Sequence, residues 1–256
     1  DFPGELDRYL EQIAALKATL EIPVVASLNG VTASGWIEHA SEIADAGADA
    51  LELNIYYVAA DIQEDGLQVE QRYLRVLQEL YKRVEIPINM KLSPFFSSVG
   101  NMVRQLEAAG ASGVSLFNRF YQPDIQIDGL RLNNALPATR SADALLAMHW
   151  VAILHGRVGC SIGATGGVHD SEDAIKMVLA GADVVHFCHA LLKQGPDLLR
   201  RLISELSEWM EQQGFTGVTE VRGRMSQANV RDPSAYERLN YIQVLQSFGD
   251  PDGVWR

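Results

Sequence analysis

Several features that would assign the chain to a class of proteins are scarce or missing from its 256 residues. The two cysteines, Cys160 and Cys188, form no C-x-x-C motif and are too few for an iron–sulfur site or a disulfide framework. No apolar run approaches the ~18 residues that a membrane-spanning helix requires. Basic residues are outnumbered, 21 Lys and Arg against 33 Asp and Glu, and the net charge of −12 argues against nucleic acid or an anionic membrane as the main partner. We therefore expect a soluble, cytoplasmic globular protein.

The sequence does contain a repeated alternation of short apolar runs and helical patterns. Strands are predicted over residues 23–29, 50–55, 87–93, 113–118, 158–164 and 183–189, and helices over residues 35–46, 67–84, 98–109, 141–154, 170–180 and 196–213. Near-continuous apolar strands that alternate with helices are typical of a parallel sheet covered by helices. The first run lacks the G-x-G-x-x-G turn of a doubly wound sheet, and a length of about 250 residues is typical of an α/β barrel. We therefore favour a (β/α)8 TIM barrel, of which about six βα units are visible, over an open doubly wound sheet.

No linker or change of composition divides the chain, so residues 1–256 are interpreted as a single domain with a C-terminal extension from about residue 215. In this extension, Asp232 and Pro233 are a suitable N-cap and first residue for a last helix. The chain opens on an amphipathic helix over residues 6–20, which leads directly into a buried strand. We therefore expect the barrel to be incomplete at its N-terminus. Further N-terminal sequence, or a partner chain, would add two strands beside the first and last visible ones.

A lysine lies inside one of the predicted strands, in the stretch "IPINMKLSPFF" (residues 86–96). Its neighbours Ile88, Met90 and Leu92 are apolar, so the ammonium group of Lys91 must be paired or must face a ligand. A lysine within an apolar strand is seldom a solvated surface residue. We therefore interpret Lys91 as a functional residue.

Other polar residues end the predicted strands at their carboxyl ends, where parallel α/β folds place their chemistry. Asn54 and Asn118 end two of the runs, and Cys188 and His189 end the last one. An Asn at such a position can also serve only to satisfy the backbone of a turn. Their common location at one end of the sheet indicates an active site.

The segment "IGATGGVHDSEDA" (residues 162–174) combines glycines with the start of a helix. Gly166 and Gly167 would let the backbone approach a ligand closely, and the N–H groups of the helix would suit a phosphate. Backbone amides at Cys188 and His189 would complete the cup. Phosphate sites at this position recur in barrels, so we predict one here, although the glycines could also serve the turn alone.

Together the motifs "LELN", "NMKLSPFF", "LFNRF" and "GATGGVHDSEDAIKMVLAGADVVHFCHALLKQGP" resemble the dihydroorotate dehydrogenase family of flavoprotein barrels, over about residues 20 to 225. The resemblance implies an FMN-dependent oxidoreductase of pyrimidine biosynthesis, which oxidises a CH–CH bond of dihydroorotate or a similar small substrate. It also implies a homo-oligomer without a metal. Lys91 occupies the place of the family's strand lysine. The resemblance implies that it contacts the polar edge of the FMN ring and stabilises the charge of the reduced flavin. The family motifs likewise imply cofactor contacts from Asn54, Phe117, Thr165, Gly166, Gly167, Cys188 and His189, and substrate contacts from Asn54, Asn118 and Arg119.

The chain departs from the family pattern at two places. The family has a Cys or Ser as catalytic base in the loop after the position of Asn54. In this chain the loop reads "NIYYVAAD", and Tyr57 falls where the base would be. A phenol with an unperturbed pKa near ~10 is a poor base unless that pKa is shifted. The N-S-x-G-x-P-N loop, which binds orotate in the family, has no match in the chain, so the substrate stays open.

Two further functions are compatible with the sequence. A Schiff-base aldolase is one, because a strand lysine such as Lys91 together with a distant phosphate cup also suits that chemistry. A non-catalytic barrel, or a partner subunit, is the other.

Overall fold

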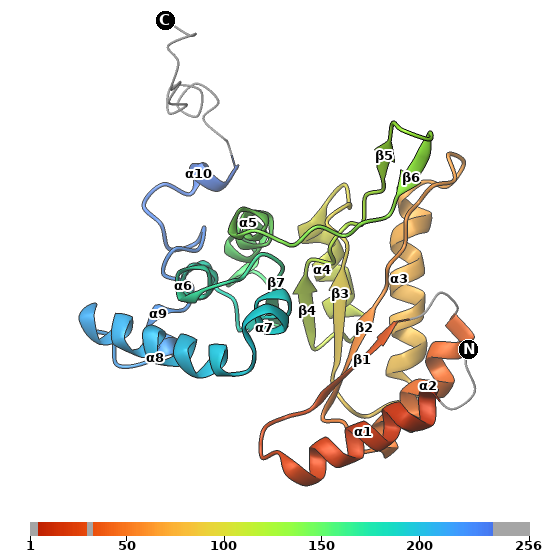
Figure 1. Ribbon diagram of the computed structural model, residues 1–256, viewed down its shortest axis with the longest axis horizontal. Coiled ribbons are helices and arrows are strands. Elements are labelled where there is room, and N and C mark those ends of the chain that lie inside the picture. The colour runs from red at the N-terminus through yellow and green to blue at the C-terminus, as the bar shows by residue number, and fades with distance from the viewer. Residues whose placement is uncertain (1–4, 30–32, 238–256) are drawn as a thin grey trace, which may run out of the picture.

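The computed structural model describes residues 5–29 and 33–237, and a curled parallel sheet forms its centre (Figure 1). The sheet has six strands in the order β1-β2-β3-β4-β7-β8, and all neighbouring strands are parallel. The strands are β1 (Val25–Asn29), β2 (Ala50–Asn54), β3 (Ile88–Leu92), β4 (Gly113–Leu116), β7 (Ser161–Thr165) and β8 (Val184–His186). Each strand predicted from the sequence is present, and the predicted parallel sheet is confirmed.

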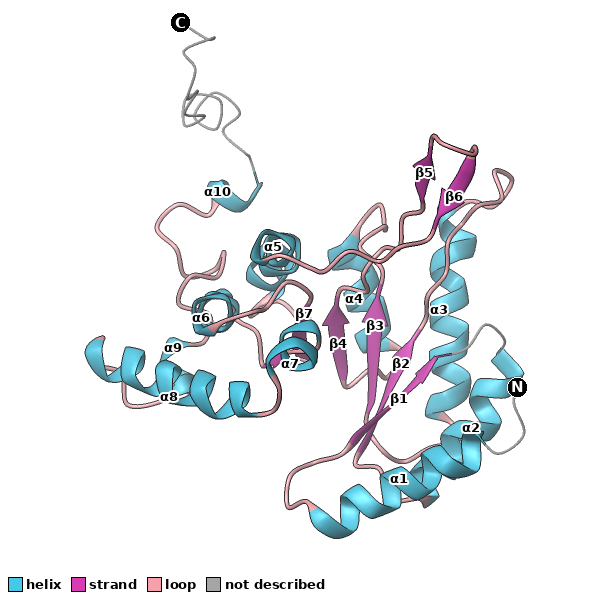
Figure 2. Cartoon of the chain, in the orientation of Figure 1, coloured by secondary structure: helices cyan, strands magenta, loops and turns pink. Residues whose placement is uncertain are grey.

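Helices alternate with the strands and cover the outer face of the sheet (Figure 2). The longer helices are α1 (Glu5–Thr19), α2 (Ala33–Asp45), α3 (Gly66–Tyr81), α4 (Val99–Ala108), α5 (Ala144–Leu154), α6 (Ser171–Ala180) and α8 (Asp197–Gln212). Shorter helical segments are η1 (Ser141–Asp143), α7 (His189–Gln194), α9 (Val218–Val221) and α10 (Ser234–Glu237). α10 begins directly after the predicted Asp232-Pro233 cap, and the rest of that predicted helix lies outside the described residues. None of the helices in the described ranges is long and apolar enough to cross a membrane.

Side chains alternate across the central strands, which gives the sheet one apolar face and one polar face. On the apolar face, Leu51, Leu53, Met90 and Leu92 are fully buried in the core beneath the helices. The concave face of the same sheet carries polar side chains, namely Ser27, Glu52, Asn89, Lys91 and Ser115. The apolar appearance of these strands in the sequence therefore comes from one face alone.

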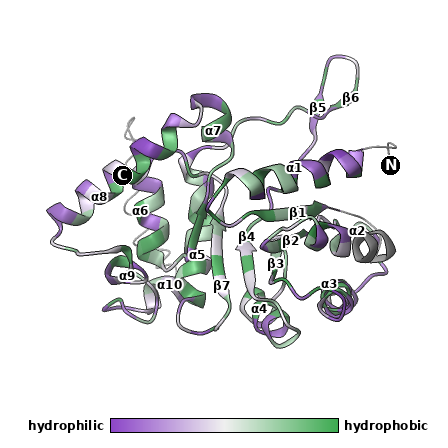
Figure 3. Ribbon diagram, turned by 90° about the horizontal axis from the view of Figure 1, so that it is seen from below, coloured by the Kyte–Doolittle hydropathy of each residue, from purple (hydrophilic) through white to green (hydrophobic). Residues whose placement is uncertain are grey.

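The strands form part of a barrel, with β1 and β8 at its two edges. Side chains at both edges are half exposed, Val25 at 54% and Val184 at 51%. Helix α1 covers part of the β1 edge: the Tyr9 hydroxyl donates to the Ser27 carbonyl oxygen (3.1 Å) and accepts from the Ser27 N–H (2.9 Å) (Figure 3). The predicted partial TIM barrel is confirmed, and the described residues do not close it into eight strands.

An antiparallel hairpin of β5 (Asp124–Gln126) and β6 (Arg131–Asn133) was not predicted. The hairpin projects from the body of the protein (Figure 1), and its apolar side chains Ile125 and Leu132 are exposed. The Asp128-Gly129 turn between alternating apolar residues is the sequence signal for this hairpin. Its strands are too short to form an apolar run of the kind that marks the central sheet.

Candidate active site

A pocket of about 310 Å³ opens at the carboxyl ends of the central strands. All cofactor- and substrate-binding residues predicted from the sequence line this pocket: Asn54, Lys91, Phe117, Asn118, Arg119, Thr165, Gly166, Gly167, Cys188 and His189. They meet there because the carboxyl ends of parallel strands share one edge of the sheet. The pocket is therefore the candidate active site.

The ammonium group of Lys91 forms an ion pair with Glu52, and Lys91 also lines the pocket. Its Nζ lies 3.4 Å from Oε1 of Glu52, and the two side chains are 22% and 10% exposed. Glu52 also accepts hydrogen bonds from the hydroxyls of Ser27 (3.3 Å) and Ser115 (3.0 Å) and from the amide of Asn89 (3.1 Å). Both alternatives raised by the sequence thus apply to Lys91: it has a partner on one side and the pocket on the other.

Glu52 and His186 are two ionisable residues of this region that the sequence analysis missed. His186 lines the pocket from the end of β8. Burial lowers the pKa of its imidazole. The charge of Glu52 acts in the opposite direction, and the charge of Lys91 lowers the pKa further. A Cβ at Gly163 would come within 2.8 Å of His186 Nε2 and 3.1 Å of Ser115 Oγ. The glycine in the neighbouring strand thus makes room for the imidazole, which is neutral at pH 7.

Two asparagines join the strand ends on one side of the pocket. The Nδ2 group of Asn118 donates to Oδ1 of Asn54 over 2.7 Å, which ties the end of β4 to the end of β2. Phe117 is buried beside them, and Arg119 follows on the pocket wall. The side chains that the sequence assigned to the substrate therefore form one group.

The glycine turn after β7 has different surroundings at its two positions. Gly166 (φ +94°) and Gly167 (φ +75°) both have positive φ, a region that favours glycine. A Cβ on Gly166 would meet nothing within 4 Å, whereas one on Gly167 would meet Ala144 N at 2.4 Å and Arg140 O at 2.8 Å. Gly166 therefore leaves open space at the pocket, while Gly167 serves the packing of the turn against the start of α5.

The first turn of α6 differs from the prediction, which assigned its N–H groups to a phosphate. The carboxylate of Asp170 caps the helix and accepts from Asp173 N (3.0 Å). The carboxylate of Asp173 is buried and accepts from His169 N (2.9 Å) and from the Ser141 hydroxyl (2.8 Å). Two protein carboxylates thus share this helix start with the N–H groups that the sequence assigned to a phosphate.

The pocket has basic side chains in its lining, although the protein as a whole is acidic. Lys91 and Arg119 line it, and no carboxylate among the described residues does. The net charge of the chain is −12, so this pocket is a local exception. Such a lining favours a ligand that carries a phosphate.

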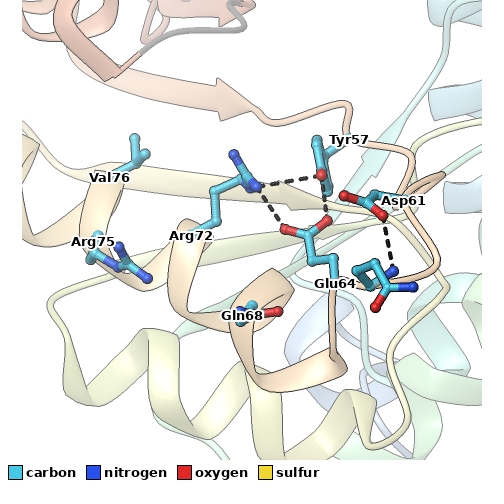
Figure 4. Close-up of a pocket in the computed structure, with 8 residues that line it drawn as sticks. Tyr57, Asp61, Glu64, Gln68, Arg72, Arg75 and Val76 are labelled. Atoms are coloured by element: carbon cyan, nitrogen blue, oxygen red, sulfur yellow. Dashed lines mark hydrogen bonds and ion pairs between the residues drawn. The ribbon is translucent and has the colours of Figure 1, made fainter.

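Tyr57, the predicted base, lies in a different pocket, of about 630 Å³, between the loop after β2 and helix α3 (Figure 4). Its hydroxyl donates to the Glu64 carboxylate, and the Arg72 guanidinium lies 4.2 Å from the centre of its ring and bonds Glu64 (2.7 Å). The hydrogen bond to Glu64, with a smaller effect of burial, raises the pKa of Tyr57. Tyr57 is not among the residues that line the Lys91 pocket, so its role as base stays a prediction that requires the loop to rearrange.

Comparison with known proteins gives one consistent result. The profile of the family described as "Dihydroorotate dehydrogenase" matches residues 4–210. The chain is 27% identical to the "Dihydroorotate dehydrogenase B (NAD(+)), catalytic subunit" of Methanothermobacter thermautotrophicus, over 79% of this chain and 69% of the relative. Relatives of the same name in Halalkalibacterium halodurans (26% identical, 86% of this chain, 73% of the relative) and a Geobacillus species (28%, 87%, 72%) are similar.

Proposed function

Because the chain belongs to the dihydroorotate dehydrogenase family, we propose that it is an FMN-dependent oxidoreductase that acts on a CH–CH bond of dihydroorotate or a similar small substrate. The observation that carries the proposal is that the predicted contact residues, Lys91 and Arg119 among them, line one pocket. Bound FMN would supply the group that accepts a hydride from the substrate.

The residues of the pocket suit this cofactor. The ammonium of Lys91 would bind the polar edge of the flavin ring, from its position between Glu52 and the pocket. The open space beside Gly166 would admit the phosphate, with N–H groups of Cys188 and His189 as donors.

The paired amides of Asn54 and Asn118, with the guanidinium of Arg119, would orient the substrate. Phe117 and Thr165 would complete the cofactor contacts, and Tyr57 would act as the base after a change in its loop. We further propose that residues 1–256 act as one FMN-binding domain and that the protein is a homo-oligomer. Analytical ultracentrifugation would contradict the last point if the full chain sedimented as a monomer at micromolar concentration.

The Schiff-base aldolase is less favoured because of the Lys91–Glu52 ion pair. Schiff-base formation requires a neutral amine as nucleophile. The Glu52 carboxylate lies 3.4 Å from Lys91 Nζ and forms an ion pair with it. An ion-paired lysine suits a cationic contact better than a covalent one.

The test is a visible absorption spectrum of the purified protein, followed by anaerobic addition of dihydroorotate. We expect flavin absorption bands and their bleaching on reduction. Retained flavin without bleaching would refute dihydroorotate as the substrate, and a colourless protein that does not bind added FMN would refute the flavoprotein proposal and favour a non-catalytic subunit. Covalent trapping of a carbonyl substrate on Lys91 by borohydride would establish the aldolase instead.

A further inference from the structure

Glu52 is a buried carboxylate in the middle of the sheet, and the proposed reaction does not use it directly. It is 7% exposed and lines a second cavity, of about 260 Å³, on the concave face of the sheet. Lys91 lines the ligand pocket, and Glu52 does not. Within the described structure the carboxylate therefore lies one layer below the pocket, with the ammonium of Lys91 between.

The hydrogen bonds of Glu52 fix the position of both of its oxygens. Oε1 accepts from Ser27 and Lys91, and Oε2 accepts from Asn89 and Ser115. Asn89 also donates to the Ser115 hydroxyl over 2.8 Å, which joins the donors to one another. The carboxylate thus has little freedom to turn, and its charge stays close to Lys91.

Stability alone does not account for a carboxylate at this position. Replacing a buried ion pair with apolar side chains is often neutral or stabilising, so such a pair is weak support for a stabilising role. Its neighbours in the strand, Leu51 and Leu53, are apolar and fully buried. The carboxylate is better explained by its effect on the ligand pocket, which it reaches through Lys91.

We propose that Glu52 is a positioning residue for Lys91 whose fixed carboxylate offsets part of the positive charge of the ammonium, and so sets the reduction potential of the bound cofactor. The inference rests on the proposed function. A flavin gains negative charge when it is reduced, so a nearby cation favours reduction and a nearby anion opposes it. Burial lowers the pKa of the neighbouring His186 and so favours its neutral form.

The experiment measures the midpoint potential of the FMN-loaded full chain at pH 7 in Glu52→Gln, Lys91→Met and the double variant. Glu52→Gln keeps the size of the side chain and should shift the potential to more positive values. Lys91→Met should shift it to more negative values. If Glu52 acts through Lys91, the Glu52→Gln substitution should shift the potential less when Lys91 is already Met.

The matched control is Glu107→Gln. This carboxylate accepts from the backbone N–H of Gly159 (2.5 Å), which precedes β7 and lies at the opposite end of the sheet from the pocket. The control should leave the potential unchanged. An unchanged potential in Glu52→Gln would overturn the inference, as would an equal shift with and without Lys91.

Two further measurements separate the possible failures. If Glu52→Gln does not fold, Glu52→Asp retains the charge but moves it away from Lys91, and it should cause a smaller shift in the same direction. An unchanged potential in Glu52→Asp would then overturn the inference. If the wild-type protein binds no FMN in a fluorescence titration, the proposed function fails and this inference with it, whereas a loaded wild type with an unresponsive Glu52 refutes the inference alone.

Discussion

The two adjacent glycines of the turn after β7 should respond differently to the same substitution. Alanine at Gly166 or Gly167 must adopt a positive φ, which is unfavourable by about 1–2 kcal/mol for a residue with a Cβ. At Gly166 this is the whole effect on stability, because its Cβ would meet nothing within 4 Å. At Gly167 the Cβ would lie 2.4 Å from Ala144 N, and backbone atoms cannot rotate away as a side chain can. Such overpacking adds about 1–3 kcal/mol, so Gly167→Ala should destabilise the protein by about 2–5 kcal/mol.

Urea unfolding of both variants beside the wild type would measure this difference, with equal m-values as the check that the unfolded states are comparable. For a chain of this size, about 1 kcal/mol corresponds to a change of about 2–4 °C in Tm. Gly166→Ala should therefore lower Tm by about 2–8 °C, and Gly167→Ala should lower it further. Equal losses in the two variants would refute the packing role assigned to Gly167.

The same pair tests the proposed phosphate site. A methyl group on Gly166 would enter the open space beside the pocket, so it should weaken FMN binding more than riboflavin binding. Gly167→Ala should weaken both ligands to a similar extent, because it displaces the turn from α5. If Gly166→Ala affected riboflavin as strongly as FMN, the phosphate would not lie at this glycine.

Three other substitutions test separate features of the structure. Tyr57→Phe should slow flavin reduction by a true substrate by roughly 10²–10⁴-fold if the phenol is the base, whereas an unchanged rate in stopped-flow assays would assign Tyr57 to its contacts with Glu64 and Arg72. The hydrogen bond from Lys17, and to a smaller extent the one from the Val24 N–H, lowers the pKa of Asp49 from 3.8. The stabilising effect of this carboxylate should therefore be present above about pH 4, and it should be lost as the pH falls through the lowered pKa. Asp49→Asn should then reduce the acid dependence of the free energy of unfolding, and an unchanged pH profile would contradict the assignment. Tyr9→Phe removes the hydroxyl that hydrogen-bonds to both the N–H and the carbonyl oxygen of Ser27 at the β1 edge, so it should increase hydrogen exchange at the Ser27 amide. Unchanged exchange would show that the edge is protected in another way.

The central sheet and most of the candidate site follow from local features of the sequence. Each strand is an apolar run that ends at a polar residue, and each is followed by a helical pattern, which together indicate parallel strands. Once the strands are parallel, residues as distant as Asn54 and His189 must meet at one edge. This is why ten of the residues that line the pocket could be predicted without knowledge of the register.

Glu52 and His186 were missed although each lies within an apolar run, the same signal that marked Lys91. Pairing Glu52 with Lys91 requires the register of β2 against β3, in which Glu52 is opposite Asn89 and Asn54 is opposite Lys91. Sequence alone gives the order of the strands more readily than their register. The surroundings of Tyr57 were equally hidden, since Glu64 and Arg72 reach it from a loop and a helix whose packing has no local signal.

The polar concave face gives a reason for the position of Lys91 in an apolar strand. Barrel interiors are commonly filled by branched apolar side chains such as Val, Ile and Leu. Here that face carries instead the hydroxyl groups of Ser27 and Ser115, the carboxylate of Glu52 and the amide of Asn89, and these groups bond to one another. Sequences depart from the local rules of core packing mainly where function requires it. The apolar face of the strands stabilises the fold, and the opposite face pairs Lys91 with Glu52 at the base of the pocket.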